Sequence, residues 1–163
     1  MRVLVAGIGN LFCGDDGFGP EVVRRLVAAG TLPEWAHGVD YGIRGMHLAY
    51  DLLEGYAALV IVDALPGDGP PGTLRVLEVG EDDLGSGDLD PHGMAPVAVL
   101  GSLRGLGGRL PPTYVVGCTP HDTDDRIGLS ATVEAAVPAA MALVGTVLRD
   151  RVAALVGTAS EVV

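Results

Sequence analysis

Gly7-Ile-Gly-Asn-Leu-Phe-Cys-Gly-Asp-Asp-Gly-Phe-Gly-Pro20 follows a short apolar run and carries two adjacent carboxylates in a glycine-rich turn. The apolar run, residues 2–6, predicts a buried strand, and Pro20 is typical of the first turn of a helix. Asp15 and Asp16 therefore lie on a strand-to-helix connection. In α/β proteins such connections carry the binding sites.

The spacing of Gly7 and Gly9 resembles the beginning of a dinucleotide-binding fingerprint, but the rest of the stretch does not match it. Phe12 stands where the third glycine is expected, and the carboxylates of Asp15 and Asp16 would repel a pyrophosphate at the helix N-terminus. The chain also has no Walker Gly-Lys-Ser/Thr sequence. Adjacent carboxylates suit a cation or a proton better than a phosphate.

Strand-like and helix-like segments alternate along the chain, which predicts a mostly parallel sheet with helices on both faces. The connection 63–72 is rich in turn residues, so we expect the strand that begins at Thr73 to pair antiparallel with its predecessor. The expected fold is an α/β three-layer sandwich with a mixed, mostly parallel sheet of about five strands, in one domain spanning residues 1–163. The expected strands are 3–6, 57–62, 73–79, 114–118 and a weaker one ending at Asp40, and the expected helices are 21–29, 46–53, 96–106 and 129–156.

Composition restricts the class of protein. The chain has 163 residues, 48% of them apolar, which is enough for a sizeable core. A net charge of −11 argues against nucleic acid or an anionic membrane as a partner. It leaves metal ions and basic protein segments as attractive partners.

The segment 135–147 is the longest membrane-spanning candidate, but it contains Pro138 and is expected to be a packed helix. Two cysteines and no signal peptide predict a cytoplasmic protein with free thiols, and nothing demands more than a monomer.

Two further residues are candidate metal ligands. Asp63 ends the apolar strand 57–62, and a carboxylate at the carboxyl end of a parallel strand points into the ligand-binding crevice, although it could equally cap the turn. His92 precedes the helix 96–106 and is either an ordinary loop histidine or a third ligand. Two carboxylates and one imidazole leave coordination positions open, as a divalent transition metal needs if it must also meet a substrate.

The other polar residues give weaker signals. His121 and Asp122 follow the last strand and suggest a solvated or substrate-contacting loop. His37 and His47 have no acidic partner at a useful spacing and are expected to be ordinary surface or helix residues.

Cys13, with His92 as its base, is a conceivable nucleophile. Neighbouring carboxylates disfavour a thiolate, however, and the apolar run 11–13 suggests packed side chains. A serine triad is harder still to assemble, because the chain has no Gly-x-Ser-x-Gly elbow.

Five blocks of the chain, in this order and at this spacing, resemble the hydrogenase maturation endopeptidase family. Members of that family trim the C-terminus of the large subunit of nickel–iron hydrogenases. The resemblance spans nearly the whole chain. The blocks are Gly7-Ile-Gly-Asn10 with Gly14-Asp-Asp-Gly-Phe-Gly-Pro20, Asp40-Tyr-Gly-Ile-Arg-Gly45, Val62-Asp-Ala64, His92-Gly-Met94 and Gly128-Leu-Ser130.

The resemblance implies a metal-binding crevice whose ligands, Asp16, Asp63 and His92, would also be the catalytic residues. The metal would be nickel carried by the substrate, although such a site could take zinc or cadmium. The implied activity is an endoproteolytic cut that removes a short C-terminal peptide from the nickel-loaded precursor of a nickel–iron hydrogenase large subunit. A non-catalytic nickel-binding chaperone for hydrogenase maturation, or a plain small-molecule-binding domain, remains the alternative.

At positions 16 and 43 the choice of residue bears on the resemblance to the family. Position 16 is Glu or Asp in the family, and the shorter Asp16 must approach the metal more closely, with Asp15 as a possible substitute ligand. Ile43 stands at the usual Thr of the pattern Asp-x-Gly-Thr-x-Gly. Substrate specificity is expected in the surface loops 80–91 and 119–126, whose acidic residues could meet a basic tail.

Overall fold

A computed structural model describes residues 1–84 and 95–157 and contains one five-stranded sheet. Four of the strands are parallel, and the fifth runs antiparallel at one edge. The order across the sheet is β2-β1-β3-β5-β4, where the strands are β1 (Val3–Ile8), β2 (Ala36–Gly42), β3 (Ala58–Ala64), β4 (Leu74–Val79) and β5 (Thr113–Cys118).

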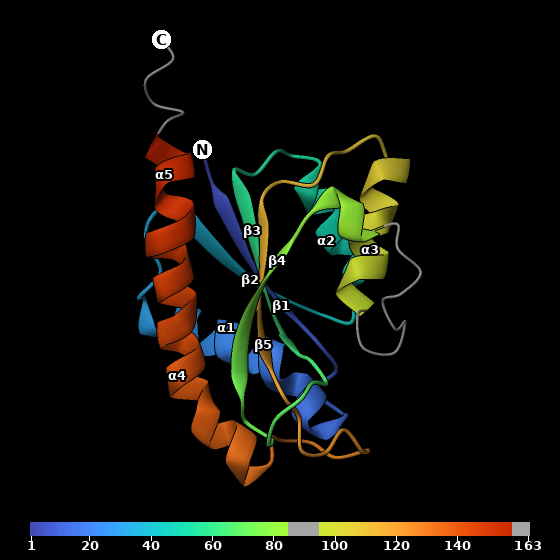
Figure 1. The fold of residues 1–163 in the computed structure, drawn as a ribbon, viewed down its shortest axis with the longest axis vertical. Helices are drawn as coiled ribbons and strands as arrows, with labels where there is room; N and C mark the ends of the chain where they lie inside the picture. The colour runs from blue at the N-terminus through green and yellow to red at the C-terminus, as the bar shows by residue number, and fades with distance from the viewer. Residues whose placement is uncertain (85–94, 158–163) are drawn as a thin grey trace.

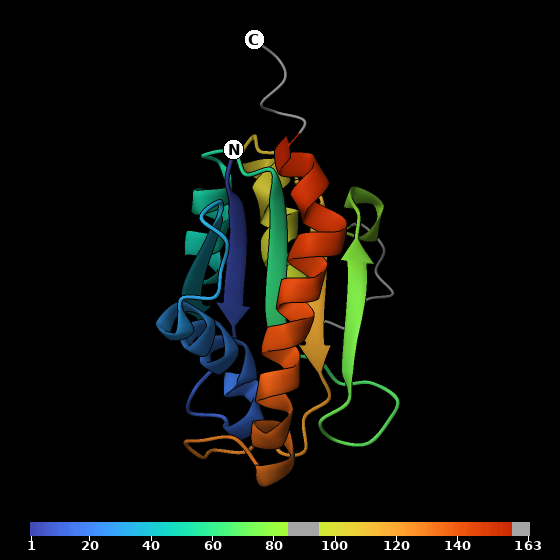
Figure 2. The same cartoon turned by 90° about the vertical axis from the view of Figure 1, so that its left-hand side faces the viewer.

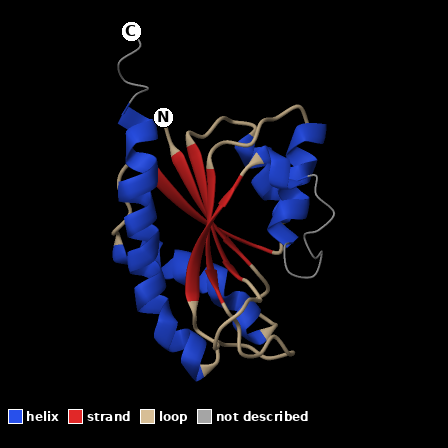
Figure 3. Cartoon of the chain, viewed as in Figure 1, coloured by secondary structure: helices blue, strands red, loops and turns tan. Residues whose placement is uncertain are grey.

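Helices cover both faces of the sheet, as Figure 1 and Figure 3 show. The helices are α1 (Phe18–Ala29), α2 (Gly45–Leu52), α3 (Ala95–Gly105) and α4 (Ala131–Val147), which continues through a π-helical turn (Leu148–Val152) into α5 (Ala153–Gly157). One face is packed against α1 and α4, and the other against α2 and α3. The expected α/β three-layer sandwich is therefore confirmed. Two short 3-10 turns, η1 (Gly14–Gly17) and η2 (Glu81–Leu84), complete the described elements.

Alternate residues of the central strands feed two separate cores. In β1, Val3 and Val5 face α1 and α4, whereas Leu4 and Ala6 face α2 and α3, and all four are fully buried. Burial on both faces explains why this strand is a continuous apolar run and not an alternating one.

The pairing of β4 differs from the expectation. The strand does not pair with its predecessor β3; it pairs antiparallel with β5, which inserts between the two. All six residues of β5 are buried, so it takes an interior position, while β4 carries Arg75 and Glu78 and suits the edge. Charged side chains at an edge also discourage pairing with another chain.

The helical segment Ala131–Gly157 is long and apolar enough, at a mean hydropathy of 1.7, to cross a membrane, and one third of its most apolar window is buried. Its side chains along one stripe, including Val133, Val137 and Val144, pack onto the sheet. Because a core helix passes the same test of length and composition, this segment is weak evidence for a membrane span. Figure 2 shows it lying along the sheet.

Candidate functional site

The carboxyl ends of the parallel strands meet at one edge of the sheet. In Figure 2 the arrowheads of β1 and β5 point to the same end, where the loop before α1 and the loop before α4 lie. Asp15 and Asp16 belong to η1, on the connection from β1 to α1, and Asp63 is near the end of β3. This is the edge at which open α/β sheets bind ligands.

Asp63 is a buried carboxylate in a strand that is otherwise entirely apolar. Its side chain is only 5% exposed. Burial raises the pKa of Asp63 well above its ordinary value, and the nearby negative charge of Asp16 raises the pKa further, while a hydrogen bond from the Ala64 backbone lowers it. The charge of Asp16 therefore acts on Asp63, whose place at the end of the strand agrees with the expectation from the sequence.

Asp16 is partly exposed and is held by the start of its own loop. The backbone N–H of Asn10 donates a hydrogen bond of 2.8 Å to Asp16 Oδ2. The turn closes tightly at Gly9, whose φ is +140° and where a Cβ would lie 1.8 Å from the Asp16 carbonyl oxygen. Only glycine fits there, so the glycine-rich sequence is what brings Asp16 back over the end of β1.

The first turn of α1 lies directly against the strand ends. A Cβ added to Gly19 would lie 2.1 Å from the carbonyl oxygen of Val62 and 2.4 Å from that of Ile8. This close backbone approach brings the segment that carries Asp16 beside the end of β3, which carries Asp63.

Asp15 is completely buried, and its carboxylate is bonded to the loop before α4. Its Oδ2 accepts hydrogen bonds from the backbone N–H groups of His121 (2.9 Å) and Asp122 (3.0 Å) and from Ser130 Oγ (2.9 Å), and its Oδ1 accepts one from Ser130 N–H (2.6 Å). Burial alone would raise the pKa of Asp15, but these hydrogen bonds outweigh it and hold the pKa below its ordinary value. An acid so fully bonded within the protein is unsuited to be a substitute metal ligand.

Backbone hydrogen bonds also join the loop before α1 to the loop before α4. Gly14 N–H donates to the Arg126 carbonyl (2.7 Å), Arg126 N–H to the Phe12 carbonyl (3.0 Å), and Asp15 N–H to the Asp122 carbonyl (2.8 Å). His121 and Asp122 thus join the candidate site through their backbones. The side chain of His121 is exposed.

His92 lies outside the described residues, so the third expected ligand has no structural account. Within residues 1–84 and 95–157, no group of three His, Cys, Asp or Glu side chains is arranged to hold a metal ion.

His37 and His47 are exposed, as expected of ordinary surface residues. The expected packing of the run 11–13 is wrong for Phe12, which is 68% exposed.

A pocket of about 440 Å³ lies between the loop after β1 and the end of β2 with the turn that follows it. Phe12 and Ile43, both strongly exposed, come from opposite loops of its lining. Asn10, which holds Asp16, lines it as well. Sequence reasoning did not identify this pocket or the role of Asn10, although the family pattern around Ile43 marks the second loop. The lining comprises Gly9, Asn10, Leu11, Phe12, Asp40, Tyr41, Gly42, Ile43 and Arg44.

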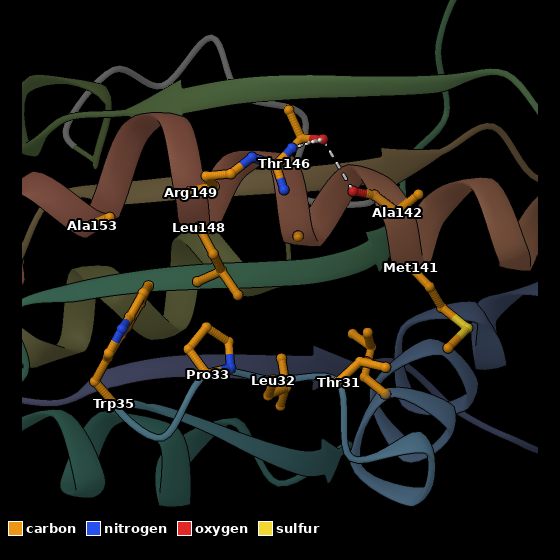
Figure 4. A pocket seen from close by; sticks show the side chains of 12 residues that line it. Thr31, Leu32, Pro33, Trp35, Met141, Ala142, Thr146, Leu148, Arg149 and Ala153 are labelled. Atoms are coloured by element: carbon orange, nitrogen blue, oxygen red, sulfur yellow. Dashed lines mark hydrogen bonds between the residues drawn. The ribbon is translucent and has the colours of Figure 1, made fainter.

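A larger pocket, of about 670 Å³, lies between the segment after α1 and the outer turns of α4 (Figure 4). Trp35, Pro33 and Leu32 form one side, and Met141 and Leu148 come from the other. Its lining contains no acid and no histidine. This apolar pocket is therefore unsuited to hydrolytic or metal chemistry.

Comparison with known proteins agrees with this architecture. Residues 20–147 match the model of the hydrogenase maturation protease (HycI) family. The hydrogenase 2 maturation protease of Escherichia coli K12 is 33% identical over 152 residues, which are 92% of each chain. The solved structure of the hydrogenase maturating endopeptidase HybD from E. coli has a TM-score of 0.76 at 31% identity, with 92% of this chain and 93% of that chain covered. The [NiFe] hydrogenase maturation protease HybD from Thermococcus kodakarensis gives a TM-score of 0.73 at 27% identity, over 90% and 99%.

The chain belongs to the hydrogenase maturation protease family, and it is an endopeptidase. The expected family is confirmed by the matched model and by relatives that cover nearly the whole chain. The expected enzyme class is confirmed with it.

Proposed function

We propose that this endopeptidase removes a short C-terminal peptide from the precursor of a nickel–iron hydrogenase large subunit, and that it does so only when the precursor carries nickel. In this proposal Asp16, Asp63 and His92 recognise the nickel that the substrate holds. The finding that carries the proposal is the pair Asp16 and Asp63 at the carboxyl edge of the sheet in a chain of this family.

The two carboxylates are suited to a divalent cation because burial and the charge of Asp16 make the negative charge of Asp63 unfavourable. A buried carboxylate next to a second one either keeps a proton or gains a cation, and both would relieve the repulsion. Two carboxylates and an imidazole would bind nickel and leave coordination positions free for groups of the substrate. Zinc or cadmium could bind to the same ligands in place of nickel.

The hydrolytic step is proposed to use water and not a covalent nucleophile. Water attacks the carbonyl carbon of the scissile bond while a carboxylate takes its proton, and that proton then passes to the leaving amide nitrogen. Asp16 is better suited to this role than Asp15, because Asp15 is fully buried and accepts four hydrogen bonds from the protein.

The alternative function, a non-catalytic nickel-binding chaperone, would use the same ligands but leave the length of the precursor unchanged. Membership of a protease family favours cleavage. The expected partner is therefore the large-subunit precursor itself.

The test is to incubate the purified protein with nickel-loaded and nickel-free precursor and to measure intact masses. The expected result is loss of a C-terminal peptide from the loaded precursor only. Asp16→Asn, Asp63→Asn and His92→Ala should each abolish the cut. Asp68→Asn, which changes an exposed acid in the loop after β3, is the matched control and should cut normally.

Unchanged masses with tight binding of the precursor would overturn the protease assignment in favour of the chaperone. Cleavage of nickel-free precursor at the same rate would overturn nickel recognition. Full activity of Asp16→Asn would remove Asp16 as the group that takes the proton from water.

A further inference from the structure

An exposed apolar strip runs along α2 from the edge of the candidate site. It consists of Ile43, Met46, Tyr50 and Leu53, whose exposed fractions are 78%, 46%, 53% and 43%. The last three are spaced by four and three residues, so they share one face of the helix, and Ile43 lies in the turn that precedes the helix. Single exposed apolar residues are ordinary, but three on one helix face with a fourth in the turn before it mark an interaction surface.

Packing against the sheet does not explain this strip. The opposite side of α2 supplies Leu48, Ala49 and Leu52 to the core, and these residues are fully or almost fully buried. The helix is therefore apolar on two sides, one facing the sheet and one facing solvent. Only the first is needed for the fold.

The strip is continuous with the candidate site. Ile43 lines the pocket of about 440 Å³ together with Asn10, and the backbone of Asn10 binds Asp16. Phe12, 68% exposed, lines the same pocket from the other loop. A protein that occupied the strip would reach, at Ile43, the pocket that Asn10 also lines.

We propose that the strip Ile43–Met46–Tyr50–Leu53 is the docking surface for the body of the protein substrate, which meets it with apolar side chains while its tail enters the crevice at Asp16. This inference rests on the proposed function. The strip carries no charge, so its contribution to binding is hydrophobic and should change little with salt. A second copy of this chain is the less suitable occupant, because it would cover the pocket that Ile43 and Asn10 line.

The test compares the double variant Met46→Ser/Tyr50→Ser with Val27→Ser. Val27 is 53% exposed but lies on α1, on the opposite face of the sheet, so Val27→Ser removes exposed apolar surface away from the strip. All substituted side chains are exposed, and far-UV circular dichroism checks that the folds match. Calorimetry gives the Kd for the nickel-loaded precursor, and cleavage kinetics give KM and kcat at low and high salt.

The expected result is a rise of about tenfold or more in Kd and KM for the strip variant, with kcat unchanged, because the lost contacts are made equally in the bound substrate and in the transition state. Val27→Ser should match the wild type, and the rise should persist at high salt. Unchanged Kd and KM in the strip variant would overturn the inference. A wild-type dimer in sedimentation that Met46→Ser/Tyr50→Ser converts to monomer would also overturn it, in favour of a second copy.

Failure of the proposed function gives a different result. If the wild type binds the precursor without cutting it, and the strip variant binds more weakly, the result supports the docking surface and contradicts the proposed cleavage.

Discussion

Asp15 and Asp63 are both buried carboxylates at one edge of the sheet, yet their surroundings move their pKa values in opposite directions. The pKa of Asp63 is raised by burial and by the charge of Asp16. The pKa of Asp15 is lowered because hydrogen bonds from Ser130, Asp122 and His121 outweigh its burial. Asp15 is therefore suited to holding loops together, and Asp63 to receiving a proton or a cation.

Asp15→Asn should destabilise the protein by about 1–3 kcal/mol at pH 7, because the amide NH2 would face N–H groups that now donate to a carboxylate. The folded-state pKa of Asp15 lies below the ordinary value of 3.8, so its stabilisation is present above that pH and is lost as the pH falls through the folded-state pKa. Urea unfolding from pH 7 down to pH 3 measures both effects. An equal loss in the variant and the wild type on acidification would contradict the assignment.

Asp63→Asn should do the reverse, raising stability at pH 7 while abolishing cleavage. The folded state of the wild type keeps a proton on Asp63 more readily than the unfolded state, so its stability falls as the pH rises above 3.8 and through the raised folded-state pKa. An uncharged amide removes that cost and the repulsion from Asp16, so a gain of roughly 1 kcal/mol or more is expected. Thermal unfolding of the metal-free protein from pH 4 to pH 8 measures this gain, and Asp68→Asn should leave the dependence of stability on pH unchanged. A less stable Asp63→Asn at pH 7 would show that the carboxylate is favourably paired.

At the scale of elements, the junction of β1 and α1 decides the geometry of the candidate site. Gly9 and Gly19 let the turn and the first helical turn come within van der Waals distance of neighbouring backbone. The acids are thus positioned by backbone contacts between rigid elements, and not by a flexible loop. Such support is what a site needs if two carboxylates must face each other.

Gly19→Ala should therefore reduce both stability and cleavage. Its Cβ would meet two carbonyl oxygens closer than any contact allows, so α1 must shift away from the strand ends, and a loss of about 2 kcal/mol or more is expected. The control is Gly101→Ala in α3, where a Cβ would meet nothing within 4 Å and a gain of about 0.5–1 kcal/mol is expected. Urea unfolding and the precursor cleavage assay check both variants. Wild-type cleavage by Gly19→Ala would show that the close approach does not position Asp16.

At the scale of the whole molecule, the helical segment Ala131–Gly157 is expected to act as part of the core and not as a membrane span. Its buried stripe packs on the sheet beside α1. We expect the protein in the soluble fraction of lysed cells, and we expect it to sediment without detergent as a monomer of 16.6 kDa. Recovery in the membrane fraction would contradict this, and a stable dimer would contradict the expected monomer.

Much of the architecture was predictable because its signals are local. Apolar runs such as residues 3–6 and 57–62 mark strands buried on both faces, and their alternation with helical periodicity predicts the three-layer α/β sandwich. The carboxyl-edge position of Asp63 follows from its place at the end of such a run. The ordered sequence blocks were likewise sufficient to identify the family.

What the amino-acid sequence by itself determined is therefore the order and type of the elements, the family and the acids at the strand ends. Only the tertiary structure decided that β4 pairs with β5, that the Asp15 carboxylate accepts hydrogen bonds from Ser130, and that Phe12 and Ile43, both exposed, line the same pocket. The physical reason is range. Local periodicity and turn chemistry act over a few residues. Edge position and burial depend on contacts between distant parts of the chain, and the hydrogen bond between Asp15 and Ser130 joins residues 115 positions apart, which no local pattern encodes.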